Sequence, residues 1–513
     1  MPPDDGLEEV SIAGLQARLK RGETTARQVV EHYLARIASV DQAGPSLRSV
    51  LEVNPDALRI AEELDRERAA GHVRGLLHGI PILIKDNIDT ADAMQTTAGS
   101  LALFGSRVEQ DATVARALRE AGAVILGKAN LSEWANFRST RSSSGWSARG
   151  RQTRNPYVLD RSPGGSSSGS GVAVSANLCV ASLGTETDGS IMSPSSANGV
   201  VGIKPTVGVT SRAGVIPISH TQDTVGPHAR TVADAAAVLS AMASGPDPRD
   251  SATSKAPGPA DYTRYLDPGG LRGARIGVAR KLHTGYSEHT DRVFEQALDV
   301  LRGCRAEVID EVEIPGGAEL RKPLEGAGES TTSEGVVLQY EFKTDIATYL
   351  ATRPDAQVKT LADLIRFNEE HADQEMPYFR QERFTASEER GLLTDELYQR
   401  AIEQARAFGR GFAAFLEEQR FDALVAPTNA PAWAIDLLNG DRTLGSSAAP
   451  AAVAGFPLIT VPAGFACDLL PIGLTFMGGP WSEPTLIRLA FAFEQAAPTR
   501  RAPCFRASAL DLP

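Results

Sequence analysis

Two short segments rich in glycine and hydroxyl side chains hold the residues best suited to chemistry. Gly164–Gly171 is GGSSSGSG, and Gly184–Ile191 is GTETDGSI. Small residues at this density lose much backbone entropy on folding, so packing alone does not favour them. A serine in such a turn becomes a nucleophile when a nearby base takes its proton. We expect the two segments to form loops that meet at one edge of a sheet, with a flexible loop as the equally weighted alternative.

The third candidate is Lys85, which ends the apolar run Ile80–Ile84. A lysine held in the interior loses solvation of its charged form, and this lowers its pKa. A neutral lysine close to serines is a recognised base for activating a hydroxyl. The alternative, a lysine whose amine reaches solvent, is the commoner outcome for such a position.

Two other motif matches favour structural roles. Gly122–Lys128 has the spacing of a phosphate-binding loop, but Ala129 stands where a serine or threonine is required, so we interpret it as a buried strand. Gly165–Gly169 fits a nucleophile elbow centred on Ser167, yet no strongly apolar strand leads into it.

Metal and disulfide chemistry receive no support from the sequence. The eight histidines form no HExxH or other paired spacing, so we expect neither a metal nor another cofactor. The four cysteines lie far apart, without a CxxC motif, at Cys179, Cys304, Cys467 and Cys504. Burial or a reducing compartment explains them better than a disulfide framework.

The elements that position these residues follow from hydrophobic periodicity. The segment Thr25–Val40 has helical spacing, and Thr25 with Gln28 has the form of a capping box. Short apolar runs that alternate with helical patterns predict buried strands in a largely parallel sheet, covered by helices. The predicted strands are Ile80–Ile84, Val124–Leu126, Leu178–Leu183, Ala274–Ala279, Ala423–Ala426 and Leu458–Val461.

Two longer regions have distinct compositions. Ser244–Gly270 is rich in Pro, Gly and Asp, which indicates a loop or linker between two halves of the chain. Residues 320–420 are charged and helical in pattern. They would form either a cap over the sheet or a solvated helical layer.

Overall composition limits the partners. The 513 residues have 52 Lys plus Arg against 64 Asp plus Glu, a formal net charge of −12, which is the wrong sign for a protein that binds phosphate backbones. An uncharged apolar run of about 18 residues is absent from the sequence, so we expect no membrane span. The acidic start, MPPDDGLEEV, lacks the features of a secretory signal, and we expect a cytoplasmic protein.

Together these segments resemble the amidase signature family of serine hydrolases. Further similar segments occur at Leu271–Gly273, Ala426–Thr428 and Pro471–Leu474, so the resemblance covers most of the chain. The matching motifs are GIPILIKDN around Lys85, GKANLSEWANF (Gly127–Phe137), PGGSSSGSG from Pro163, GTETDGSI (Gly184–Ile191), GVVGIKPTVG (Gly199–Gly208) and QDTVGP (Gln222–Pro227).

The resemblance implies an architecture and a catalytic triad. We expect a single large α/β fold with a mixed, twisted sheet covered by helices on both faces. Residues 1–70 would form a helical segment packed on an amidase signature domain at 71–513, with its signature core at 75–230. By motif position Ser190 is the nucleophile, Ser166 a bridging serine after a cis peptide bond, and Lys85 the base.

The family pattern also implies an oxyanion hole and a substrate class. The backbone N–H groups of Thr187, Asp188, Gly189 and Ser190 would bind the oxyanion. Asp188 departs from the glycine or alanine that is commoner there. Asp223 is expected to hold a loop rather than to perform chemistry.

Within the family the stretches Asn130–Arg138 and Ser144–Gly150 resemble bacterial peptide amidases, which release ammonia from C-terminal amides of peptides. Relatives that accept a carboxylate carry an arginine two or three residues after the nucleophile. Met192 and Ser193 stand there instead, which favours neutral acyl groups. Candidate substrate contacts are Trp134, Phe137, Trp146 and Trp433, although core packing is the commoner role for each.

Three functions remain open at this point. The first is a stand-alone amidase for peptide or other neutral amides, with no obligatory protein partner. The second is an aryl acylamidase or carbamate (urethane) hydrolase with the same acyl-enzyme chemistry. The third is the glutaminase subunit of a transfer-RNA-dependent amidotransferase, which would need a partner to receive ammonia.

Overall fold

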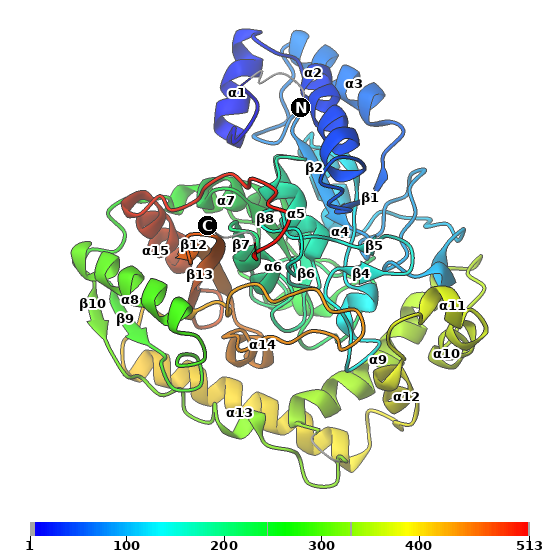
Figure 1. Ribbon diagram of the computed structural model, residues 1–513, viewed down its shortest axis with the longest axis vertical. Helices are drawn as coiled ribbons and strands as arrows, with labels where there is room; N and C mark the ends of the chain where they lie inside the picture. Colours follow the sequence, from blue (N-terminus) through cyan, green and yellow to red (C-terminus); the bar gives the residue numbers. More distant parts are fainter. Residues whose placement is uncertain (1–5, 244, 329–330, 511–513) are drawn as a thin grey trace.

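A large mixed sheet forms the centre of the protein, for which a computed structural model describes residues 6–243, 245–328 and 331–510. The sheet has 11 strands in the order β1-β3-β2-β6-β8-β7-β12-β13-β11-β9-β10, and β4 pairs with β5 in a separate ribbon (Figure 1). The strands are β1 (Val50–Val53), β2 (Pro81–Lys85), β3 (Val124–Ala129), β4 (Trp146–Ser147), β5 (Arg151–Gln152), β6 (Ala181–Glu186), β7 (Val201–Lys204), β8 (Thr224–Ala229), β9 (Arg275–Val278), β10 (Glu307–Ile309), β11 (Ala423–Pro427), β12 (Leu458–Ala466) and β13 (Leu470–Met477).

Helices flank this sheet. Helix α15 contacts both α7 and α8, all three contact the sheet, and α5 and α6 form another pair packed against it. The helices are α1 (Ile12–Arg21), α2 (Ala26–Arg36), α3 (Ala57–Ala69), α4 (Thr113–Glu120), α5 (Ser168–Ser175), α6 (Met192–Ala197), α7 (Val232–Met242), α8 (Glu288–Gly303), α9 (Ser333–Ala351), α10 (Leu361–Glu370), α11 (Ala372–Glu375), α12 (Glu382–Glu388), α13 (Glu396–Glu418), α14 (Ala449–Ala454) and α15 (Glu483–Ala496). Among the described residues, none of the helices combines the length and apolarity needed to span a membrane.

All six predicted strands are present, as β2, β3, β6, β9, β11 and β12, although β6 begins at Ala181, three residues after the predicted start at Leu178. The capping box of Thr25 and Gln28 is also present at the start of α2. The expectation of a largely parallel sheet was wrong, because six of the ten strand pairs are antiparallel. Only the pairs of β2 with β3 and β6, and of β9 with β10 and β11, are parallel. The mixed sheet expected from the family resemblance is what the structure contains.

The sheet register brings the chemically interesting residues to one edge. Strands β2 and β6 are parallel neighbours, so both end at the same edge. Strand β8 runs antiparallel to β6 and begins there, with Thr224 opposite Glu186. Lys85 at the end of β2, the turn after Glu186 and the loop before Thr224 therefore lie close together.

The charged region at residues 320–420 contains helices α9 to α13, which Figure 1 shows along the side of the molecule opposite α1 to α3. It packs onto the sheet-edge loops. Glu375 accepts hydrogen bonds from Ser100 Oγ at 3.1 Å and from the Leu101 amide at 2.6 Å. Gln222 in the loop before β8 donates to Glu334 on α9. These contacts favour the cap interpretation over a solvated layer.

The stretch Ser244–Gly270 contains two short 3₁₀ helices, Ser251–Lys255 and Tyr262–Tyr265, joined by irregular chain. It does not divide the sheet, because β12 from the second half of the chain pairs with β7 from the first half. Residue 244 lies outside the described residues.

Candidate active site

Lys85 occupies a fully buried position at the end of β2. Its Nζ donates to Ser166 Oγ at 2.8 Å, to Thr185 Oγ1 at 2.8 Å and to the Thr185 carbonyl at 3.3 Å. Burial lowers the pKa of Lys85 to about 7, against the opposing influence of the Asp223 and Glu186 carboxylates. A large fraction of this amine is therefore neutral near pH 7 and can accept a proton.

Ser166, whose hydroxyl contacts this amine, is also fully buried. The peptide bond between Gly165 and Ser166 is cis, as the family resemblance implied. Gly165 has no room for a side chain, since an added Cβ would lie 2.4 Å from Ser132 Oγ and 2.8 Å from Ser144 Oγ. The Ser166 carbonyl accepts from the Ser132 amide at 3.0 Å. Close packing thus fixes the hydroxyl of Ser166 on Lys85.

Ser190 follows β6 in the neighbouring turn, and 8% of its surface reaches solvent. Its carbonyl accepts from the Ser167 amide at 3.1 Å, so the two glycine-rich segments meet as expected. Glu186 Oε2 accepts from the amides of Ile191 at 2.6 Å and Met192 at 2.9 Å, and this fixes the turn. Within residues 6–243, 245–328 and 331–510, no group hydrogen-bonds to Ser190 Oγ. The hydroxyl is free to react.

Four consecutive amides in the same turn, from Thr187 to Ser190, donate to no acceptor in the described part of the chain. Buried backbone N–H groups are nearly always paired, so the free amides of the buried residues Thr187, Gly189 and Ser190 are available to an acceptor from a ligand. The turn is braced from behind, where Thr187 Oγ1 donates to Asp223 Oδ1 at 2.6 Å and Gln222 Nε2 donates to the Thr187 carbonyl at 3.4 Å.

Asp223 braces the loop before β8 as well as the turn. Its Oδ2 accepts from the amides of Ile218 at 2.7 Å and Ser219 at 2.9 Å. Burial raises the pKa of Asp223 to about 6, while its hydrogen bonds act in the opposite direction. Its three hydrogen bonds hold the turn and the loop, and its charge also keeps the pKa of Lys85 from falling further.

Replacing Asp223 with alanine should lower the free energy of unfolding by about 2–4 kcal/mol, because it leaves two buried amides and a hydroxyl without an acceptor. Asparagine at this position keeps one acceptor oxygen and should lose about half as much. Thermal and urea unfolding of both variants measures the effect. Unchanged stability in Asp223→Ala combined with loss of turnover would instead assign the carboxylate to the chemistry.

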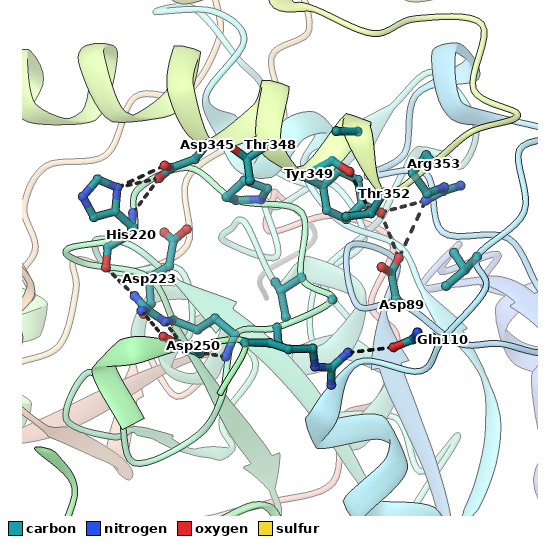
Figure 2. Close-up of a pocket in the computed structure, with 18 of the residues that line it drawn as sticks. Asp89, Gln110, His220, Asp223, Asp250, Asp345, Thr348, Tyr349, Thr352 and Arg353 are labelled. Carbon is teal, nitrogen blue, oxygen red and sulfur yellow. Dashed lines mark hydrogen bonds and ion pairs between the residues drawn. The ribbon is translucent and has the colours of Figure 1, made fainter. Parts of the chain in front are cut away.

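A cavity beside Asp223 lies away from Ser190. It has a volume of about 800 Å³ and is lined by residues from five stretches of the chain, among them Asp89, Arg212, His220, Asp223 and Arg353 (Figure 2). Its cations are already partnered: Arg212 forms a bidentate ion pair with Asp250, and Arg353 lies 3.7 Å from Asp89. Neither Lys85 nor the two serines of the site line this cavity.

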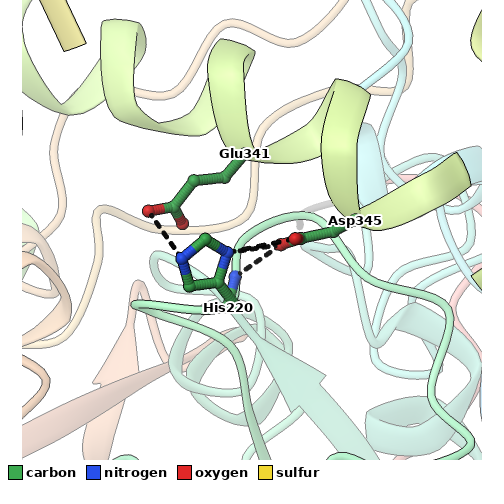
Figure 3. A group of neighbouring side chains, drawn as sticks. All are labelled: His220, Glu341 and Asp345. Carbon is green, nitrogen blue, oxygen red and sulfur yellow. Dashed lines mark hydrogen bonds and ion pairs between the residues drawn. The ribbon is translucent and has the colours of Figure 1, made fainter. Parts of the chain in front are cut away.

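His220, Glu341 and Asp345 form a cluster at one side of the cavity (Figure 3). His220 Nδ1 lies 2.9 Å from Asp345, and Nε2 lies 3.4 Å from Glu341. Burial lowers the pKa of His220, but the two carboxylates outweigh it and raise the pKa. The Glu341 carboxylate also accepts from Ser219, Thr221 and Tyr398. The cluster is therefore an ion pair that joins the loop before β8 to α9.

The aromatic residues predicted as substrate contacts take different places. Trp134 packs against Phe384 and Phe137 against Phe342, between the sheet-edge loops and the cap. Trp146 is buried beside Phe379. Trp433 is half-buried and donates from Nε1 to Asp441 at 2.8 Å. Their contact with substrate stays a prediction.

Several buried polar residues near the site carry no clear sequence signal. Lys128 and Lys204 are fully buried like Lys85, but their amines donate to backbone carbonyls and a threonine, with no serine in reach. His228 Nδ1 and Ser195 Oγ share a hydrogen bond at 2.8 Å. Burial lowers the pKa of His228 to about 3. Thr185 and Glu186, which hold Lys85 and the turn, lie within the quoted motif.

Comparison with known proteins supplies matches over nearly the whole chain. The family model described as Amidase matches residues 28–487. A probable amidase of Arabidopsis thaliana is 43% identical over 507 residues, which is 97% of this chain and 92% of the relative. A glutamyl-tRNA(Gln) amidotransferase subunit of Synechococcus sp. (strain CC9311) is 36% identical over 513 residues, which is 95% of this chain and 97% of the relative.

Two solved structures are similar in both sequence and fold. Native peptide amidase from Stenotrophomonas maltophilia is 50% identical, with a TM-score of 0.90 over 97% of this chain and 99% of that one. Peptide amidase PAM in complex with the competitive inhibitor chymostatin is also 50% identical, with a TM-score of 0.92 over 97% of this chain and 100% of that one. The likeness extends over the fold and is not confined to a motif.

Proposed function

This chain belongs to the Amidase family and hydrolyses amide bonds, and from that premise we propose that it cleaves neutral carboxamides, above all C-terminal amides of peptides, through Ser190, Ser166 and Lys85. One observation carries the proposal. The amine of a buried lysine with a pKa of about 7 lies 2.8 Å from Ser166 Oγ, beside a turn that presents Ser190 and four unpaired amides.

The proposed chemistry begins with a proton relay. Neutral Lys85 takes the proton of Ser166 Oγ while Ser166 takes the proton of Ser190 Oγ, which attacks the carbonyl carbon. The relay then returns the proton to the leaving nitrogen as the C–N bond breaks. Ammonia or an amine departs, and water hydrolyses the acyl ester on Ser190 by the same route. Catalytic hydrogen bonds often close only with substrate bound, which accounts for the free Ser190 hydroxyl.

The amides of Thr187, Asp188, Gly189 and Ser190 would stabilise the negative oxygen of the tetrahedral intermediate. They precede the amides of Ile191 and Met192, which Glu186 already occupies. The anion therefore has only the four earlier N–H groups available. Donors fixed in position before the reaction give strong stabilisation, because no reorganisation is needed as the charge develops.

The proposal predicts that activity rises with pH. Lys85 acts in its neutral form, so kcat/KM should increase through an apparent pKa near 7 and reach a plateau on the alkaline side. Asp223 and Glu186 face the amine and keep the pKa from falling further, while His228, with a pKa of about 3, stays neutral throughout. Initial rates on one amide between pH 5 and pH 9 test this. A flat profile would contradict the role of Lys85.

Neutral acyl groups and peptide amides are favoured over the alternatives by two observations. Ser193, where some relatives carry a carboxylate-binding arginine, accepts a hydrogen bond from Asn429 at 2.7 Å and presents no charge. The chain is 50% identical to the peptide amidase chains of two solved structures and 36% identical to the amidotransferase relative. A partner-dependent glutaminase is therefore the second candidate.

One competition experiment separates the candidates. The purified chain is incubated with a blocked dipeptide amide, a fatty amide, an anilide and an aryl carbamate together, with Ser190→Ala as the blank, and products are followed by mass spectrometry. Preferential loss of ammonia from the dipeptide amide is the expected result. Faster cleavage of the anilide or carbamate would move the function to aryl-amide or urethane hydrolysis. No cleavage by the lone chain would favour the glutaminase that depends on a partner.

A further inference from the structure

Asp188 is the exposed residue in a turn whose neighbours are buried. Thr187 on one side has 7% of its surface exposed and Ser190 on the other has 8%. Its carboxylate receives no hydrogen bond from any residue of the described ranges. The Asp188 carboxylate is therefore accessible and unpartnered within the turn that carries Ser190, at a position where the family resemblance implies glycine or alanine more often.

Glu334 brings a second carboxylate to the same place from the first turn of α9. Gln222 links it to the turn, because Nε2 donates to Glu334 Oε1 at 2.9 Å and to the Thr187 carbonyl at 3.4 Å. Desolvation, followed by the charges of Glu334 and Glu186, raises the pKa of Asp188 well above its usual range. Desolvation likewise raises the pKa of Glu334. The two carboxylates thus lie close enough to interact electrostatically.

Arg383 on α12 completes the group with an unsatisfied cation. Its guanidinium lies 5.4 Å from the ring centre of Phe137 and attracts Glu334. The guanidinium makes no hydrogen bond or close ion pair with any described residue, and its buried Nε lacks a partner. A guanidinium has five N–H donors that need acceptors. Leaving such a donor buried without a partner is costly, so a ligand is the natural source of its acceptor.

The charges of Asp188, Glu334 and Arg383 indicate which kind of ligand this group of residues favours. An anionic ligand would be drawn to Arg383 but repelled by the negative charge that Asp188 and Glu334 share, and a cationic one would meet the opposite conflict. A neutral peptide unit satisfies both sides, because its N–H is a donor and its carbonyl an acceptor within a few bonds of each other. In an N-acylated amino-acid amide this unit directly precedes the carboxamide to be cleaved.

Resting on the proposed function, we propose that Asp188, Glu334 and Arg383 form a subsite for the peptide unit that precedes the scissile carboxamide. Asp188 and Glu334 accept its N–H, and Arg383 donates to its carbonyl. The subsite also explains how an acidic side chain is tolerated beside an oxyanion hole, since the substrate's own N–H engages the carboxylate. Amides without a peptide unit leave all three groups unpaired and are poorer substrates.

A matched pair of substrates tests the subsite. N-acetyl-phenylalaninamide carries the peptide unit, and 3-phenylpropanamide has the same aromatic acyl chain without it. Ammonia release gives kcat/KM for each. We expect the intact chain to prefer the first by about 100-fold, and Arg383→Met and Asp188→Ala each to reduce that preference by about tenfold or more, the range of a charge-assisted hydrogen bond.

Two further variants keep the test sharp. Arg366→Met removes an exposed arginine of α10 that pairs with Asp363, and it should leave the preference unchanged. Glu334→Gln retains an acceptor but loses the charge, so the preference should fall less than in Arg383→Met. Circular dichroism verifies folding of each variant.

The outcomes are separable. Equal kcat/KM on both substrates, or a preference that survives Arg383→Met and Glu334→Gln, overturns the subsite and leaves the amidase proposal intact. Cleavage of an anilide with no ammonia from either amide overturns the proposed peptide-amide specificity, and the subsite with it.

Discussion

Replacement of Ser190 by alanine is expected to lower kcat by roughly 10⁴- to 10⁶-fold, the scale of loss when an acylated serine is removed from a catalytic unit. The fold should be unaffected. The turn around Ser190 is held by its carbonyl and by Glu186, while the hydroxyl bonds to no described residue. Product formation under single-turnover conditions measures the loss, and thermal unfolding verifies that the variant is native.

Ser167→Ala is the matched control. Ser167 Oγ donates to the Thr185 carbonyl at 3.0 Å and accepts from the Thr185 amide at 3.2 Å, so its contacts are structural. The control should lose about 1–2 kcal/mol of stability and keep most of its turnover. Substantial activity in Ser190→Ala, with none in Ser167→Ala, would transfer the nucleophile to Ser167 and restore the elbow interpretation.

Lys85→Met should abolish turnover almost as fully, by about 10³-fold or more, because methionine fills a similar volume but accepts no proton. The same variant has a second signature in stability. The amine has a pKa of about 7 when folded against 10.5 for an unperturbed lysine, so the unfolded chain binds one more proton between these values. The stability of the intact enzyme therefore falls as pH drops from about 10 to about 7, by on the order of 4 kcal/mol, and is then flat with respect to this group.

Methionine cannot titrate, so the variant lacks this dependence. Guanidinium unfolding of both proteins at pH 7 and pH 10 should show the variant gaining stability relative to the intact enzyme at the lower pH. An equal difference at the two pH values would mean that Lys85 is charged in the folded protein, and the relay would lose its base.

Local pattern was sufficient for the strands that carry the site. The run before Lys85 is continuous and apolar, the run before Gly184 is interrupted only by Ser182, and both overlap buried strands in the structure. Whether two strands pair parallel or antiparallel could not be predicted from local pattern. Strand β8 returns antiparallel beside β6, and β12 reaches β7 from far along the chain. Neither relation leaves a local pattern, so the expectation of a largely parallel sheet was wrong.

The residues of the site also differ in whether local sequence could predict their contacts. Motif position placed Lys85 and Ser166 in contact, and their hydrogen bond is present. Residues that surround them from distant segments were not accessible. Arg383 and Glu334 lie in a charged helical region whose composition is that of a solvated surface. Lys128 and Lys204 follow apolar runs as Lys85 does, and only the partners reached in three dimensions distinguish the three amines.

The pairing of β7 with β12 also has a consequence for synthesis on the ribosome. Lys204 in β7 faces Leu458 in β12, so 254 residues separate the two partners in the chain. At an elongation rate of about 5–20 residues per second, β12 is synthesised roughly 13–50 s after β7, and the edge of β7 stays uncovered until then. During that interval the nascent chain presents an open edge of buried, apolar strand, a template for pairing with other chains. Slower elongation or depletion of chaperones that bind nascent chains should therefore increase aggregation of this protein more than its final stability would suggest.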